Sequence, residues 1–348
     1  MPRVAIDRTI QRRETGPFAF PLGVYPVEPL APVSGFVSEF EAADSGDTFG
    51  FQGEMADDWE EWPDRFMFDV AITATRLRSL ARLLFTLLPG RVYPILDVIG
   101  TDAYREIDPF IAYELVGIER FYDAIRMYGD WLFEDGLVGF GAMSVDPFIY
   151  VFIDEHKLVT IRAQLDLKER VERMLSAFEL AEVEEIRGPD AAEHEHRSVL
   201  YTPLDRPEYL SGEDILHRLR YAWRLQLNID ASVNLDDAGT DLGVTAWRCL
   251  TRCLRDEQST DIYADLLLTA DCLDTAETLV TEAIVAQAPE GENWLEIEVL
   301  VSERVTPERF AELLDVPLEE VSLDASRILA LRWVEGDEDE PGEETEEG

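Results

Sequence analysis

The sequence predicts an α+β N-terminal part, with a mixed sheet and flanking helices, followed by a mostly α-helical C-terminal domain. Three observations lead to this expectation. Apolar residues recur at helical spacing from Phe66 to Leu88. Two runs rich in β-branched and aromatic residues flank a polar turn between Pro147 and Gln164. Beyond the polar segment Gly188–Arg197 the apolar spacing becomes mostly helical.

The first part of the chain, residues 1–60, is rich in proline, glycine and aspartate. It predicts an irregular arm with one or two edge strands. The helix expected from Phe66 ends at Pro89-Gly90, a pair that stops helices. A strand is expected at 91–99 and an amphipathic helix at 118–133.

The clearest strand signal is a hairpin. Phe148–Ile153 and Leu158–Ile161 are apolar runs on either side of the polar residues Asp154–Lys157. A helix with apolar residues at helical spacing is expected after them, over 167–178. With these elements, residues 61–187 make up the predicted α+β domain.

The second half of the chain is expected to begin with a linker, residues 188–204, and to continue as a helical domain over 205–334. Its expected helices are 212–225, 245–254, 260–270, 275–287, 294–304, 307–314 and 318–333. The tail 335–348 contains only Glu, Asp, Gly, Pro and Thr. It cannot bury enough apolar surface to offset its ordering entropy, so we expect it to be disordered.

The charge balance is strongly acidic, with 73 Asp and Glu against 30 Lys and Arg and a net charge of −43. Such a surface repels DNA, RNA and anionic lipid, so we expect no direct nucleic-acid contact and no membrane partner. The chain has two lysines, Lys157 and Lys168, beside many arginines. Both a salt-rich habitat, where counterions screen the self-repulsion, and a GC-rich genome are compatible with that bias.

The remaining composition is that of a soluble protein, with 46% hydrophobic residues. We expect no signal peptide, because residues 1–20 have no continuous apolar stretch. The apolar segment 66–88 is interrupted by Asp69 and several arginines, which makes it too costly to embed in lipid. Three cysteines are few and odd in number, which favours a reducing, cytoplasmic compartment.

One pair of histidines is a candidate metal site. Gly188, His194 and His196 form a G-x5-H-x-H string that resembles the opening of the cupin metal motif. On a strand, H-x-H places both imidazoles on one face, where a carboxylate could complete a facial triad. The glutamate of the cupin motif is absent from 197–203. The favoured interpretation is two exposed histidines in a charged linker, with no cofactor bound, and the metal site remains the alternative.

Two other ligand-like patterns are expected to be structural. Cys249 and Cys253 lie four residues apart on an expected helix, with Cys272 on or near the next, and His217 could join them as a fourth zinc ligand. Buried small side chains on an apolar face explain the cysteines better than zinc does. The segment 234–241 supplies about half of the ligands of a calcium loop, and a polar turn explains it without an ion.

A short segment near the C-terminus has a recognisable pattern. Thr306, Pro307, Ala311, Asp315-Val316-Pro317 and Val321 stand where helix-turn-helix domains place a cap, a first-turn proline, a small residue, the turn and a buried branched residue. Residues 306–327 therefore resemble a helix-turn-helix, with Asp315 in place of the usual turn glycine. The resemblance implies a compact helical unit that often reads DNA in that family. Here the second helix would carry Glu319, Glu320 and Asp324, which repel phosphate.

No complete catalytic motif is present, which favours a non-enzymatic role. We expect an interaction or scaffold protein, with a protein partner or self-association through the C-terminal domain. One alternative is a metal-dependent enzyme that uses the region of His194 and His196. A second is a DNA-linked regulator that acts through the segment resembling a helix-turn-helix, residues 306–327.

Overall fold

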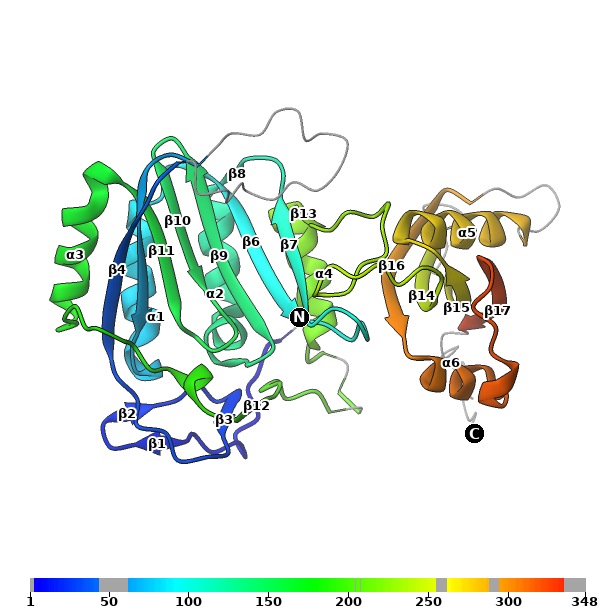
Figure 1. Ribbon diagram of the computed structural model, residues 1–348, viewed down its shortest axis with the longest axis horizontal. Coiled ribbons are helices and arrows are strands. Elements are labelled where there is room, and N and C mark those ends of the chain that lie inside the picture. Colours follow the sequence, from blue (N-terminus) through cyan, green and yellow to red (C-terminus); the bar gives the residue numbers. More distant parts are fainter. Residues whose placement is uncertain are drawn as a thin grey trace, which may run out of the picture. The chain divides into compact units, whose positions relative to one another are not determined.

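The computed structural model describes residues 3–43, 62–203, 205, 206, 208–254, 262–287 and 294–334. The chain forms two compact units, shown as a ribbon in Figure 1. The first unit comprises Met1–Ile99 and Ile107–Ile229. The second comprises the loop Gly100–Glu106 and the chain from Asp230 onward. The expected tail, 335–348, lies outside the described residues.

The first unit is built on a sheet of nine strands in its described part, ordered β13-β7-β6-β9-β10-β11-β5-β4, with the short β8 paired to β6. Every pairing between its named strands is antiparallel, so the expected mixed sheet is wrong. The strands are β4 Gly35–Glu41, β5 Arg65–Ala71, β6 Arg91–Ile99, β7 Ile107–Ala112, β8 Val116–Gly117, β9 Val138–Val145, β10 Phe148–Ile153, β11 Val159–Gln164 and β13 Leu225–Leu227.

Four helices pack on one face of this sheet: α1 Ala74–Leu84, α2 Ile118–Glu134, α3 Lys168–Ala177 and α4 Gly212–Trp223 (Figure 1). Alternation along β10 sends Val151 to the core between sheet and helices, while Tyr150 and Phe152 belong to the opposite face. The core also contains Phe121 of α2 and Trp223 of α4, whose rings are 5.2 Å apart. None of the described helices combines the length and apolarity needed to cross a membrane.

The helix expected over 66–88 is only half helical. Residues Arg65–Ala71 form strand β5, and α1 begins at Ala74. Phe66 and Val70 are four residues apart, a spacing that puts side chains on the same side of both a helix and a strand. Phe68, between them, completes an alternation of period two that the helical interpretation overlooked. The expected strand at 91–99 and the helix at 118–133 are confirmed as β6 and α2.

The N-terminal arm, residues 1–60, contains four strands in its described part, of which β4 belongs to the large sheet and the other three are short. Strand β1, Glu14–Thr15, pairs with β2, Phe18–Ala19. Strand β3, Val24–Pro26, pairs with β12, His194–His196, in a separate two-stranded sheet. Residues 188–204, expected to be a linker, therefore contain a strand and lie within the first unit.

The second unit contradicts the expected mostly α-helical domain. It holds a four-stranded antiparallel sheet ordered β16-β14-β15-β17, with helices α5 and α6. The elements are β14 Thr245–Leu254, β15 Ile262–Ala270, α5 Leu273–Ala286, β16 Glu296–Val305, α6 Pro307–Leu314 and β17 Arg327–Val334. The described residues thus contain more strand than the sequence pattern indicated.

Strand β14 shows why the pattern misled. Cys249 and Cys253 are buried on one face, and Arg248 and Arg252 point to the other. Four residues are close to one helical turn and equal two strand repeats, so this spacing fits both structures. The strict alternation with arginine was the distinguishing signal.

The segment that resembles a helix-turn-helix contains its first helix and turn. Thr306 caps α6 by accepting a hydrogen bond from the Arg309 amide at 3.3 Å, and Asp315 ends the helix with a left-handed φ of 58°. The second helix is replaced by a single 3-10 turn, Leu318–Glu320, which leads toward β17. Val321 is half-buried against the cluster around Phe310.

Candidate metal centre

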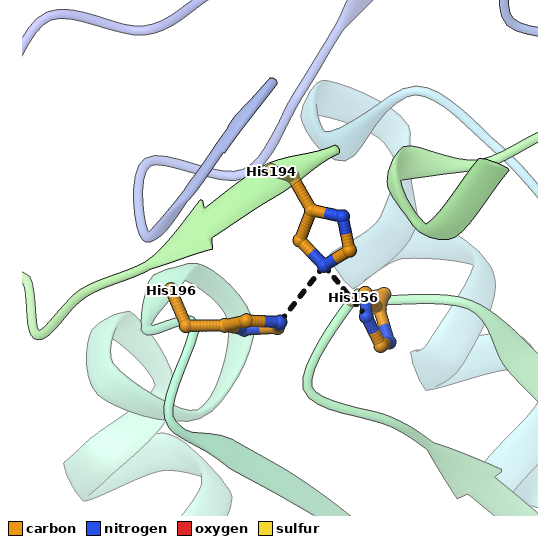
Figure 2. A group of neighbouring side chains, drawn as sticks. All are labelled: His156, His194 and His196. Carbon is orange, nitrogen blue, oxygen red and sulfur yellow. Dashed lines mark hydrogen bonds between the residues drawn. The ribbon is translucent and has the colours of Figure 1, made fainter. Parts of the chain in front are cut away.

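Three imidazoles converge at one point in the first unit, as Figure 2 shows. The Nε2 atom of His194 lies 3.0 Å from Nε2 of His156 and 3.0 Å from Nε2 of His196. The ring centroids are 4.8 Å apart in every pair, and the ring planes are inclined by 71° to 73°. The three rings are therefore evenly spaced and equally inclined to one another, and their Nε2 atoms point toward a common centre.

Strand β12 supplies two of these rings. In an extended strand alternate residues share a face, so His194 and His196 point the same way while Glu195 points out to solvent. Pairing with β3, which places His194 opposite Pro26 and His196 opposite Val24, holds the strand in place.

The turn between β10 and β11 supplies the third ring. A carboxylate oxygen of Asp154 accepts a hydrogen bond from the Leu158 amide at 2.7 Å, and Lys157 takes a left-handed φ of 67°. The ammonium of Lys157 is buried and donates to the main-chain carbonyls of Val138 and Asp154. This tight turn fixes His156 at the end of the hairpin.

Each ring is oriented through its other nitrogen. Nδ1 of His194 lies 2.7 Å from the Ala192 carbonyl, and Nδ1 of His196 lies 2.6 Å from the Gly136 carbonyl. A carbonyl can only accept, so both Nδ1 atoms carry the proton and both Nε2 atoms of the neutral rings carry a lone pair. Nδ1 of His156 lies 3.1 Å from Glu155 Oε1 and 3.6 Å from Asp154 Oδ2.

A contact between two glycines makes the support of His196 possible. A Cβ on Gly136 would lie 2.1 Å from the Gly23 carbonyl oxygen, and a Cβ on Gly23 would lie 2.0 Å from the Gly136 nitrogen. Arg197, which follows β12, donates its amide to the Gly23 carbonyl at 2.9 Å and accepts from the Gly136 amide at 3.2 Å. Because neither glycine has a side chain, the two backbone segments can approach closely, and the Gly136 carbonyl reaches Nδ1 of His196.

The electrostatics concentrate the proton on one ring. Burial alone would lower the pKa of His156, but its hydrogen bonds to Asp154 and Glu155 outweigh burial and raise that pKa to about 10. Burial lowers the pKa of His196, against the hydrogen bond to Gly136, and the neighbouring imidazoles lower it further. If the three rings carry one proton beyond their neutral forms, that proton is on His156.

The donor set fits a transition metal. For two nitrogens 3.0 Å apart, a metal about 2.1 Å from each subtends an angle of about 91°, which is the facial geometry of an octahedral site. At the same metal–nitrogen distance, a tetrahedral site would need the two nitrogens about 3.4 Å apart, which is only slightly farther. Within the described residues, no fourth His, Cys, Asp or Glu ligand atom lies within 4.8 Å of all three.

Carboxylates lie near the three histidines, but none has an oxygen close to all three ligand nitrogens among the described residues. Asp97 on β6 stands opposite Gly139 of β9, and a Cβ on Gly139 would lie 3.1 Å from the Cα of Asp154. Burial, and then the charges of Glu155 and Asp154, raise the pKa of Asp97 to about 7. The carboxylates of Asp154 and Glu155, which contact His156, favour a bound cation.

Of the candidate residues identified from sequence, His194 and His196 come together, and their partner is a third histidine instead of a carboxylate. His156 was missed because it belongs to a hairpin turn 38 residues before His194, and proximity across such a separation is a property of the fold. Three of the four histidines of the chain meet here, which is the signal that sequence reasoning could have weighed.

The other ligand-like patterns remain apart from this centre. Cys249, Cys253 and Cys272 are buried and free, and burial raises the pKa of the Cys249 thiol to about 12. In the segment 234–241, a carboxylate oxygen of Asp236 accepts from the amides of Ala238 and Thr240, as in a polar turn.

The comparisons with known proteins add no relative. No protein-family model, no curated protein and no solved structure matches this chain.

Proposed function

We propose that the protein is a metal-dependent enzyme with a single divalent transition-metal ion bound by His156, His194 and His196. The observation that carries the proposal is the 3.0 Å contact between Nε2 of His194 and Nε2 of His196. Both rings are protonated at Nδ1, so in their neutral forms this contact sets one lone pair against another.

One added proton relieves the repulsion between the Nε2 lone pairs less completely than one metal ion does. A protonated His156 can donate Nε2–H to His194, which satisfies one of the two short contacts. The contact between His194 and His196 would need a second proton, and therefore a second imidazolium in the same cluster. One metal ion shared by the three Nε2 atoms satisfies both contacts.

The donor set favours zinc, copper, iron or nickel, the metals that imidazole ligands suit. The hydrogen bonds at all three Nδ1 atoms are the outer contacts that orient metal-binding histidines and increase their basicity. This proposal departs from the expectation of a protein without a cofactor and takes up the alternative that sequence analysis attached to His194 and His196.

A catalytic role is favoured over a structural one because three protein ligands leave a coordination position open. Asp154 and Glu155 approach Nδ1 of His156, on the side of the ring away from the three Nε2 atoms. They therefore orient the ring and do not act as further metal ligands. A metal bound in this way acts as a Lewis acid and, for zinc, lowers the pKa of a bound water to about 7.

The first test is elemental analysis of untagged protein. We expect about one transition-metal ion per chain in wild type and near-complete loss in His194→Ala and His196→Ala, because each removes one of three ligands. His217→Ala is the matched control, since His217 is the fourth histidine and lies exposed on α4. Wild type without metal after reconstitution with zinc, copper, iron or nickel would contradict the metal site.

A second test separates an enzyme from a structural site. Cobalt(II) is loaded into the chain, and its visible spectrum is followed while azide is added. An open position predicts a change in the d–d bands at saturating azide, because azide binds the metal directly. An unchanged spectrum would mean a closed site, and the metal would then be structural.

A further inference from the structure

A second candidate site lies between helices α2 and α4, on residues that the metal centre does not use. The groove there has a volume of about 680 Å³. Two of its lining residues, Ala124 and Tyr128, are buried. Its remaining lining residues are Arg120, Asp123, Met127, Arg220, Tyr221, Ala222 and Arg224.

The groove is cationic on a strongly anionic protein. Three arginines line it, and the one lining acid, Asp123, is paired with Arg126 at 3.0 Å. Arg224 is paired with Glu114, so a carboxylate is already bound by one of the three guanidinium groups. Arg120 is exposed and has no ion-pair partner among the described residues. The chain as a whole has a net charge of −43, so a groove lined by three arginines and one acid differs from the average composition of the protein.

Two large apolar side chains are exposed beside these arginines. Tyr221 is 87% exposed and Met127 is 63% exposed. Tyrosine, methionine and arginine are the residue types that protein interfaces favour, and tyrosine and arginine contribute most often to binding energy. The groove therefore combines apolar contact area with fixed positive charge.

We infer that this groove binds a short acidic, amphipathic segment of a partner protein. An apolar side chain of the segment packs on Met127 and Tyr221, and one of its carboxylates pairs with Arg120. A groove between helices suits a peptide helix that presents apolar residues on one side. This inference is independent of the metal centre and gives a specific form to the interaction role expected from sequence.

Electrostatics favours a short acidic peptide over a nucleic acid. At 0.15 M salt the screening length is about 8 Å, so the charges of a short acidic segment in the groove interact with the lining arginines more than with the distant acidic surface. A nucleic acid carries a charge at every phosphate and would extend over the surrounding acidic surface, which repels it. Arginine also matches the planar carboxylate with two parallel hydrogen bonds.

The experiment is selection from a random twelve-residue peptide display library on the full-length chain in 0.15 M KCl. We expect the selected peptides to be enriched in Asp and Glu together with Leu, Phe or Met. Their binding, measured by fluorescence polarisation, should weaken at least about tenfold in the double variant Arg120→Glu with Tyr221→Ser. Both side chains are exposed, so the variant should keep its fold, which circular dichroism checks.

The matched control is Arg170→Glu with Leu165→Ser, which makes the same change of charge and also removes an exposed apolar side chain, at positions on and next to α3. Selected peptides should bind this control as they bind wild type. Failure to enrich any peptide, enrichment without acidic residues, or equal binding to the groove variant would overturn the inference. ATP or duplex DNA binding that is lost in the groove variant would assign the groove to a phosphate-bearing ligand instead.

Discussion

Arg304 and Asp102 form a buried ion pair within the second unit, with the side chains 3% and 1% exposed. Nη2 of Arg304 lies 2.8 Å from Oδ1 of Asp102, and Nε lies 3.0 Å from both carboxylate oxygens. The same guanidinium also donates to the Asn234 side chain and to the Leu235 carbonyl. This pair ties the loop Gly100–Glu106 to strand β16 of the second unit.

Removing one partner of this pair should therefore destabilise the second unit strongly. Asp102→Ala leaves the Arg304 charge buried and uncompensated, at a cost of about 3–5 kcal/mol. The unit should melt earlier in calorimetry, while the double variant Asp102→Leu with Arg304→Met should recover much of the loss. A single variant with an unchanged transition would show that water reaches the guanidinium.

Gly136→Ala should weaken metal binding although it alters no ligand. Its Cβ would collide with the Gly23 carbonyl, displacing the carbonyl that orients His196. Loss of such an outer contact typically costs about 10–100-fold in metal affinity, measurable by competition with a chelating dye. Gly90→Ala, where an added Cβ meets nothing within 4 Å, is the control. Equal affinity in both variants would argue against this support.

Chelation should loosen the N-terminal arm. The metal would join β12, and through it β3, to the β10–β11 turn, so its removal eliminates one of the constraints on the arm. We expect hydrogen exchange at the amides of Val24 and Glu195 to accelerate in EDTA, with amides of the central strand β9 unchanged as an internal control. If the Val24 and Glu195 amides exchanged at the same rates with and without EDTA, the metal would have to bind elsewhere.

Asp97→Asn should stabilise the metal-free protein above neutral pH. Folding raises the pKa of Asp97 from 3.8 to about 7, so the folded state holds the proton more tightly and stability falls as pH rises from about 4 to 7. Asparagine cannot ionise, so the variant's higher melting temperature should emerge over that interval and be complete above pH 7. Metal loading should reduce the gain, because a nearby cation stabilises the carboxylate. A gain that is equal at pH 4 and pH 8 would contradict this.

The melting temperature of the whole chain should rise between low salt and molar KCl. The net charge of −43 makes the folded state repel itself, and salt at 1 M reduces the screening length to about 3 Å. Differential scanning fluorimetry across a KCl series measures this. A flat or falling curve would leave genome composition as the explanation of the arginine bias.

The sequence predicted an element correctly where the spacing of its apolar residues fits either a helix or a strand but not both. Helix α2 and strand β6 were predicted close to their observed bounds, because their apolar patterns match a single period. It failed at β5 and β14, where residues four apart satisfy both periods. The site was half predicted for a related reason. The H-x-H string is local, whereas His156 and the Gly23–Gly136 contact depend on tertiary structure.

The assignment of the loop Gly100–Glu106 to the second unit has a consequence for synthesis. Asp102 leaves the ribosome 202 residues before Arg304, a delay of about 10–40 s at typical elongation rates. During that interval the strands and helices of the first unit are all completed, whereas the partner of Asp102 does not yet exist. The second unit is therefore the last to be completed, because its buried ion pair cannot form until Arg304 has been synthesised.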